Sequence, residues 1–159
     1  MRLGYIGALR IAIPNAMAHQ PFHTVDPIRR SLMSRVRAKD SKPELAVRRA
    51  THALGYRARL HRRDLPGTPD LVFPRLRKAI FVHGCFWHRH PGCVRTTNPK
   101  TRADYWAEKF SANVARDAAR LEELKALGWD VLVIWECETF DRGALSLRLS
   151  KFMNAERTS

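Results

Sequence analysis

Residues 70–90 read DLVFPRLRKAIFVHGCFWHRH, and this stretch decides the fold. The short apolar run 70–73 and the longer run 78–83 both have the composition of β-strands, and the second is apolar enough for a buried position. The residues before them, LPGTP, have the composition of a turn. We therefore predict two neighbouring strands. If they pair as a hairpin, Asp70 and His83 lie at the same end of the sheet.

A helix precedes these strands over residues 41–55. Ser41 is a good N-cap, and Pro43 suits the first turn. Glu44 stands three residues after Ser41, which makes a capping box, and Gly55 is a natural stop.

The rest of the chain continues the alternation of strands and helices. Residues 56–62 alternate as a half-buried strand does, whereas 94–103 are polar and form a loop. Apolar residues at spacings of three and four predict a long helix. The order is helix, three strands, helix, strand, helix, an α/β class with a mixed sheet flanked by helices. Further predicted elements are a basic helix or arm on DNA at 26–40, the long helix 104–127, a strand at 130–136 and a last helix at 142–153.

Charge and length limit the function. The 159 residues suffice for one core, and we expect a loosely ordered extension over 1–25 and a single domain over 26–157. Lys plus Arg number 29 against 15 Asp plus Glu, a formal net charge of +14. This excess favours a polyanion, most simply nucleic acid, over a merely solubilising surface. No apolar run approaches the roughly 20 residues that cross a bilayer.

The three cysteines suggest a metal site. Cys85, His90 and Cys93 give C-x4-H-x2-C, and Cys137 follows a later strand. Two cysteines and a histidine close together with one distant cysteine form a four-ligand zinc pattern. Buried free cysteines with surface histidines are the alternative, but one zinc site would use every cysteine. An odd count also disfavours a secreted disulfide framework and fits a cytoplasmic protein. Spacing alone does not choose between His88 and His90.

Asp70 is a candidate for catalysis. A lone Asp after a turn is more often a turn or cap residue. Beside His83, however, its carboxylate could hold a hard cation and activate the water bound to it. Phosphodiester cleavage needs a metal to offset the charge on the phosphate and a base for the attacking water.

Four motifs in order carry a resemblance to a known family: LPGTPDLVF, KAIFVHGCFWHRH, YWAEKFSANVARD and LGWDVLVIWEC. Over about residues 29–140 they resemble the very-short-patch repair (Vsr) DNA mismatch endonucleases. The resemblance implies nicking of double-stranded DNA beside T:G mismatches that arise when 5-methylcytosine deaminates. It also implies the restriction-endonuclease-like core of the PD-(D/E)xK superfamily, in the order αβββαβ.

The resemblance implies roles for five residues. Asp70 would bind Mg²⁺, together with the backbone carbonyl of Val82, which stands where the family has Thr. His83 replaces the lysine of the superfamily triplet, and His88 would be the base that activates water. Glu44 matches a carboxylate that orients metal-bound water, while its capping-box role remains an equal alternative.

The resemblance also implies the zinc ligands and a DNA wedge. It selects His90 over His88, although this chain has one extra residue between His90 and Cys93. The implied ligands are Cys85, His90, Cys93 and Cys137. Aromatic side chains would wedge into the duplex beside the mismatch, where unstacking costs less. The implied wedge residues are Phe86, Trp87 and Trp106. Core packing remains a strong alternative for Trp106.

The implied partners follow from the same resemblance. We expect a monomer that binds T:G-mismatched double-stranded DNA, with Mg²⁺ as catalytic and Zn²⁺ as structural cofactor. It would act in the cytoplasm, associated with a bacterial nucleoid and with no membrane. It would be linked functionally to a cytosine-5 DNA methyltransferase and to repair proteins. The alternatives are a restriction-type endonuclease of the same fold and a non-catalytic, zinc-stapled DNA-binding protein.

Overall fold

The computed structural model describes residues 39–156. The expected extension 1–25 and most of the basic segment 26–40 lie outside this range. No helix within it is long and apolar enough to span a bilayer. The mixed α/β class is confirmed by the elements α2 (Lys42–Ala53), β1 (Arg59–Leu60), β2 (Leu71–Phe73), β3 (Lys78–His83), α3 (Ala103–Ala126), β4 (Asp130–Trp135) and α4 (Arg142–Asn154).

The four described strands form one mixed sheet in the order β1-β2-β3-β4. β2 pairs antiparallel with β3, with Leu71 opposite Ile80, so the predicted hairpin is present. β3 and β4 run parallel, with His83 opposite Trp135, and helix α3 makes the crossover that a parallel pair requires. Asp70 directly precedes β2 and His83 ends β3, which brings both to the same end of the sheet.

The strand predicted over 56–62 is wrong in extent, because only Arg59 and Leu60 pair with β2. His61 adopts a left-handed backbone with a φ of 47°, and this ends the strand. Tyr56 and Ala58 still pack against the core as their alternation indicated, whereas Leu60 is 40% exposed.

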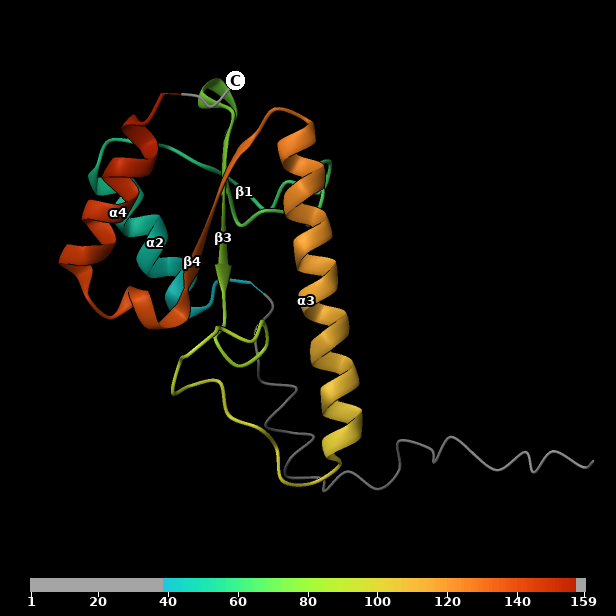
Figure 1. The fold of residues 1–159 in the computed structure, drawn as a ribbon. Helices are drawn as coiled ribbons and strands as arrows, with labels where there is room; N and C mark the ends of the chain where they lie inside the picture. Colours follow the sequence, from blue (N-terminus) through green and yellow to red (C-terminus); the bar gives the residue numbers. More distant parts are fainter. Residues whose placement is uncertain (1–38, 157–159) are drawn as a thin grey trace, which may run out of the picture. The chain divides into compact units, whose positions relative to one another are not determined.

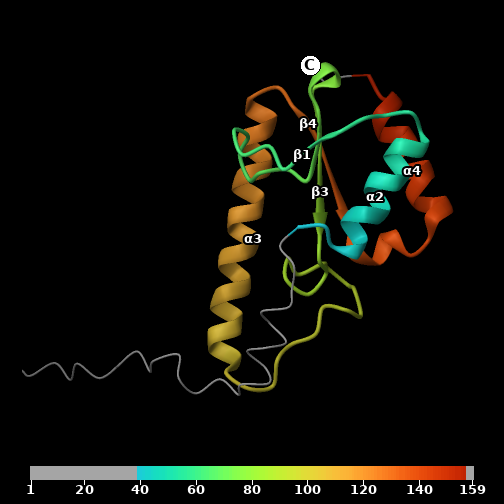
Figure 2. The ribbon, with the colours of Figure 1, turned by 180° about the vertical axis from the view of Figure 1, so that it is seen from behind.

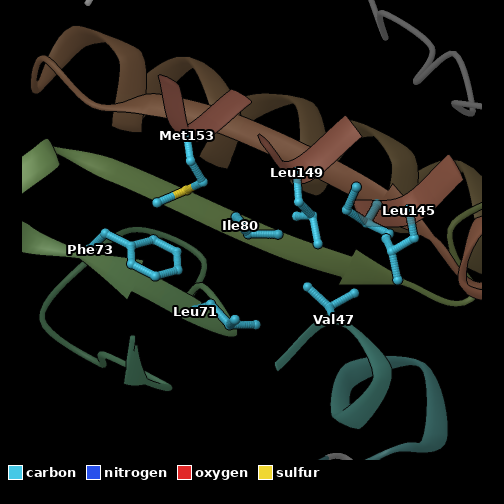
Figure 3. Close-up of a cluster of buried hydrophobic side chains, with 8 residues drawn as sticks. Val47, Leu71, Phe73, Ile80, Leu145, Leu149 and Met153 are labelled. Atoms are coloured by element: carbon cyan, nitrogen blue, oxygen red, sulfur yellow. The ribbon is translucent and has the colours of Figure 1, made fainter. Parts of the chain in front are cut away.

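Helices cover both faces of the sheet. Figures 1 and 2 show α2 and α4 on one face and α3 on the other. Because side chains alternate along a strand, neighbouring residues enter different cores. The core under α2 and α4 appears in Figure 3; it comprises Val47, Leu71, Phe73, Ile80, Ile134, Leu145, Leu149 and Met153. The core under α3 comprises Val72, Ala79, Phe81, Leu124 and Trp129.

The helix ends largely follow the sequence. The Oγ atom of Ser41 accepts a hydrogen bond from the N–H of Glu44 at 3.3 Å, as the predicted N-cap requires.

A buried lysine in β3 connects the end of α4 to the sheet. Lys78 Nζ donates to the carbonyls of Phe152, Met153 and Ala155 at 2.7–3.0 Å. These carbonyls close a helix C-terminus, where a cation is favourable.

Candidate active site and metal centre

A cavity of about 800 Å³ opens where β2 begins and β3 ends. The predicted site residues Asp70, Val82, His83 and His88 all line it, together with Asp117 from α3. Its lining also includes the basic side chains of Lys39, Arg63, Arg116 and Arg120 and the acidic side chains of Asp64 and Glu123. A concave site with convergent titratable groups is typical of a binding or catalytic site.

The carboxylate of Asp70 is held at one oxygen. The backbone N–H of Val82 donates to Oδ2 of Asp70 at 2.7 Å, which leaves Oδ1 for another partner. Burial raises the pKa of the Asp70 carboxyl from 3.8 to about 6, and the nearby charge of Glu44 raises it further against the opposing effects of Val82, His61 and His88. A carboxylate whose charge is this costly fits a hard cation, which would relieve the cost.

The two predicted histidines stack on each other. The ring centroids of His83 and His88 lie 4.0 Å apart, with an angle of 12° between the planes. His83 is 7% exposed, and its burial, together with the charge of His88, lowers the pKa of His83 to about 4. His83 is therefore neutral at neutral pH and can accept a hydrogen bond or bind a cation.

Asp117 belongs to this site although sequence reasoning missed it. Its Oδ2 lies 2.5 Å from Nδ1 of His88. Since a carboxylate accepts, Nδ1 carries the proton and Nε2 is the nitrogen that can take one. A signal existed: Asp117 lies four residues from Asn113 and from Leu121, so it shares the inward face of the predicted helix.

Glu44 lies at the start of α2, where half of the expected capping box forms: Ser41 accepts from its N–H. It is 3% exposed, and its Oε2 accepts from the N–H of Asp40 at 2.8 Å rather than from that of Ser41. Its Oε1 lies 3.0 Å from Nε2 of His61, a second residue that sequence reasoning missed. Glu44 therefore accepts a backbone hydrogen bond at the N-terminus of α2, and its charge lies close enough to Asp70 to raise the pKa of that carboxyl.

The expected zinc ligands come together. The ligand atoms of Cys85, His90, Cys93 and Cys137 all lie within 4.8 Å of one another. Nδ1 of His90 is 3.7 Å from Sγ of Cys85 and 3.3 Å from Sγ of Cys137. His88 faces His83 and Asp117 instead, so His90 is the histidine that lies with the cysteines.

The chemistry of the cluster fits a soft divalent metal. Burial raises the pKa of the Cys85 thiol to about 12, so a thiolate there needs a cation beside it. The N–H of Arg95 lowers the pKa of Cys93, which favours its thiolate. His90 is braced by stacking on Trp135, with centroids 4.3 Å apart. Three thiols and one imidazole at these spacings could bind zinc as a closed tetrahedral site.

The three expected wedge residues form one cluster. The ring of Trp106 lies 6.0 Å from that of Phe86 and 6.1 Å from that of Trp87. Asn113 of α3 donates to the carbonyl of Trp87 at 3.2 Å, which fixes the loop to the helix. Trp106 is 8% exposed, so core packing accounts for it in this state, whereas Phe86 and Trp87 are only partly buried.

These contacts define a class of protein before any comparison. A buried carboxylate suited to a divalent cation lies beside a histidine whose proton position a second carboxylate fixes. Groups of this kind can activate water for hydrolysis.

Comparison with known proteins narrows this class to one family. The model of the family described as DNA mismatch endonuclease Vsr matches residues 23–95. A type II nicking enzyme, V.XorIIP of Xanthomonas oryzae pv. oryzae, is 55% identical over 126 residues, which cover 79% of this chain and 92% of the relative. The DNA mismatch endonuclease Vsr of Escherichia coli is 36% identical over 132 residues, 80% of this chain and 84% of the relative. The chain therefore belongs to the Vsr endonuclease family, a family of hydrolases.

Proposed function

We propose that this protein is an Mg²⁺-dependent endonuclease that nicks double-stranded DNA next to T:G mismatches and so starts very short patch repair. Its substrates would arise by deamination of 5-methylcytosine, the product of a cytosine-5 DNA methyltransferase, and repair proteins would complete the work. The enzyme would act as a monomer. The observation that carries the proposal is the meeting of Asp70, His83 and the His88–Asp117 pair in one cavity.

Asp70 and the backbone carbonyl of Val82 would hold the Mg²⁺ ion, in a restriction-endonuclease-like core. When bound, the ion offsets charge on the scissile phosphate and makes bound water more acidic. The free oxygen of Asp70, Oδ1, is the one available to it, since Oδ2 is engaged by Val82. His83 replaces the usual lysine as a neutral imidazole, and Glu44 would orient water from the other side of Asp70.

His88 would act as the general base. Its Nε2 takes a proton from the attacking water, whose oxygen forms a bond to phosphorus as the bond to the leaving sugar oxygen breaks. Asp117 keeps the imidazole in the required tautomer through Nδ1 and stabilises the imidazolium that forms. Arg116 and Arg120 line the same cavity and would contact the phosphates.

The zinc centre would give this loop its shape. Cys85 and His90 flank Phe86, Trp87 and His88 in the sequence, so a metal bound at both ends restricts the residues between them. Cys137, just after β4, would join the loop to the sheet. Structural zinc is therefore expected to position both the base and the aromatic wedge.

Mismatch selection would come from the aromatic cluster. Phe86, Trp87 and Trp106 would enter the stack beside the mismatch, and a T:G pair opens more easily than a matched pair. Lys109 lies 5.8 Å from the ring centroid of Trp87 and would bring positive charge to this contact.

The test is nicking of an end-labelled duplex that carries one T:G pair within a library of flanking sequences. With Mg²⁺ the wild type should cut one strand, and EDTA should stop the reaction. Asp70→Ala should bind the duplex with nearly unchanged affinity and fail to cut it. Binding without cleavage by the wild type under all metal conditions would instead favour the non-catalytic DNA-binding alternative.

A further inference from the structure

His61 lies between the two carboxylates of the proposed site. Its Nε2 is 3.0 Å from Oε1 of Glu44, and its Nδ1 is 3.9 Å from Oδ1 of Asp70. The Asp70 oxygen that faces the imidazole is the one that Val82 leaves free. One side chain thus lies between a residue of α2 and the residue that directly precedes β2.

The backbone of His61 is fixed as well. Its N–H donates to the carbonyl of Asp70 at 3.2 Å, one step beyond the pairing of Leu60 with Leu71. Its φ of 47° is in the left-handed region, which is unfavourable for a non-glycine residue and persists where the surroundings enforce it. This conformation ends β1 at the point where the side chain meets the site.

The contact with Glu44 is buried and incompletely satisfied. Oε1 of Glu44 and Nε2 of His61 are both shielded from solvent, and neither has a well-aligned hydrogen bond among the described residues. Oε2 of Glu44 is already engaged by the N–H of Asp40, and Arg48 approaches Oε1 only to 3.6 Å. Buried polar atoms left in this state call for an explanation, and a catalytic role or a bound water or ion is among the recognised ones.

We propose that His61 is a positioning residue that holds the carboxylate of Glu44 beside Asp70, so that the pair is arranged for the divalent cation. This inference rests on the proposed function. A neutral imidazole carries one N–H; with that proton on Nε2, which is 3.0 Å from Oε1 of Glu44, Nδ1 is left as an acceptor. The 3.9 Å between Nδ1 and Asp70 is too long for a direct hydrogen bond and suits a bridging water.

The test compares His61→Gln with His61→Asn. The amide nitrogen of Gln can reach the place of Nε2 and donate to Glu44, whereas the shorter Asn cannot. His61→Ala removes the contact altogether, and His52→Ala on the exposed end of α2 is the matched control. The first readout is Mn²⁺ binding to the zinc-loaded protein without DNA, followed by electron paramagnetic resonance. The second separates the single-turnover rate at saturating Mg²⁺ from the affinity for DNA.

Removal of a group that orients a metal ligand costs roughly 10–100-fold in metal affinity or activity. His61→Ala and His61→Asn should show a loss of this size in Mn²⁺ affinity and in rate, while DNA affinity, zinc content and the control stay near wild type. His61→Gln should recover most of both. Equal behaviour of Gln and Asn, wild-type Mn²⁺ binding by His61→Ala, or no Mn²⁺ binding by the wild type would overturn the proposal. If His61→Ala does not fold, the Gln–Asn comparison decides. Because Mn²⁺ binding is measured without DNA, a failure to nick T:G duplexes would count against the proposed function alone.

Discussion

Nδ1 of His88 lies 2.5 Å from Oδ2 of Asp117, so a residue of the loop that follows β3 is oriented by a residue in the middle of α3. In the proposed mechanism, the loop and the helix must be in their correct relative positions for His88 to act as a base. The hydrogen bond from Asn113 to the carbonyl of Trp87 fixes the same two segments. This coupling links the shape of the loop to catalysis.

Replacement of Asp117 by Asn should slow chemistry without weakening DNA binding. Asn keeps the size of the side chain but removes the charge that stabilises protonated His88. General-base catalysis contributes about 10²–10⁴-fold, and we expect Asp117→Asn to lose a large part of it. Single-turnover nicking and equilibrium DNA binding are the measurements. Asp104→Asn, on the exposed start of the same helix, should be near wild type in both. Equal nicking rates for Asp117→Asn and Asp104→Asn would show that Asp117 takes no part in catalysis.

Asp70→Asn should stabilise the metal-free protein near neutral pH. The pKa of Asp70 is raised from 3.8 in the unfolded chain to about 6 in the folded protein. Between pH 3.8 and about 6 the folded state binds more protons than the unfolded state. The ionisation of Asp70 therefore lowers the free energy of unfolding as the pH rises through this range, by at most about 3 kcal/mol. Asn cannot ionise, and its carbonyl can still accept from Val82. The melting temperature of Asp70→Asn without Mg²⁺ should exceed that of the wild type at pH 7.5.

Two comparisons check the origin of that effect. The difference in melting temperature should shrink as the pH falls through about 6 and should vanish well below pH 3.8, where the wild-type carboxyl is protonated in both states. Added Mg²⁺ should raise the melting temperature of the wild type more than that of Asp70→Asn. If the wild type without Mg²⁺ melts at a higher temperature than Asp70→Asn at pH 7.5, other groups of the protein already compensate the buried charge of Asp70.

The zinc content of single variants should distinguish the role of His88 from that of His90. His90→Ala should lower bound zinc and the melting temperature, because His90 faces Cys85 and Cys137. His88→Ala should keep its zinc and lose nicking, since His88 faces Asp117. Cys137→Ser should resemble His90→Ala. Metal analysis of the purified proteins decides the matter, and full zinc occupancy in His90→Ala would remove that residue from the centre.

The sequence predicted the framework of this site better than its supporting residues. Asp70 and His83 were expected at one end of the sheet because strand alternation and a short turn limit how a hairpin can pair. Cys137 was found by counting cysteines. His61 was missed because a left-handed backbone turns its side chain, and alternation does not predict that conformation. Asp117 was missed because the rotation of α3 against the sheet depends on packing between distant segments.

Trp87→Ala should affect cleavage at a mismatch more than overall affinity. Stacking of a base on an aromatic side chain contributes about 1–3 kcal/mol, so a loss of roughly tenfold to a hundredfold in rate is expected if that energy is expressed in the transition state. Contacts from Lys and Arg to phosphates remain and maintain binding. Phe140→Ala, an exposed aromatic outside this cluster, is the control. A parallel fall in affinity and rate would indicate a general binding role for Trp87.

Mismatch selection is measured most simply with the wild type alone. Single-turnover nicking is compared on T:G and T:A duplexes of identical flanking sequence, at the same Mg²⁺ and salt concentrations. We expect rapid nicking of one strand beside the T:G pair and far slower cleavage of the T:A duplex, because the matched pair resists the aromatic wedge. Equal cleavage of the two duplexes would contradict this expectation and favour a restriction-type endonuclease of the same fold.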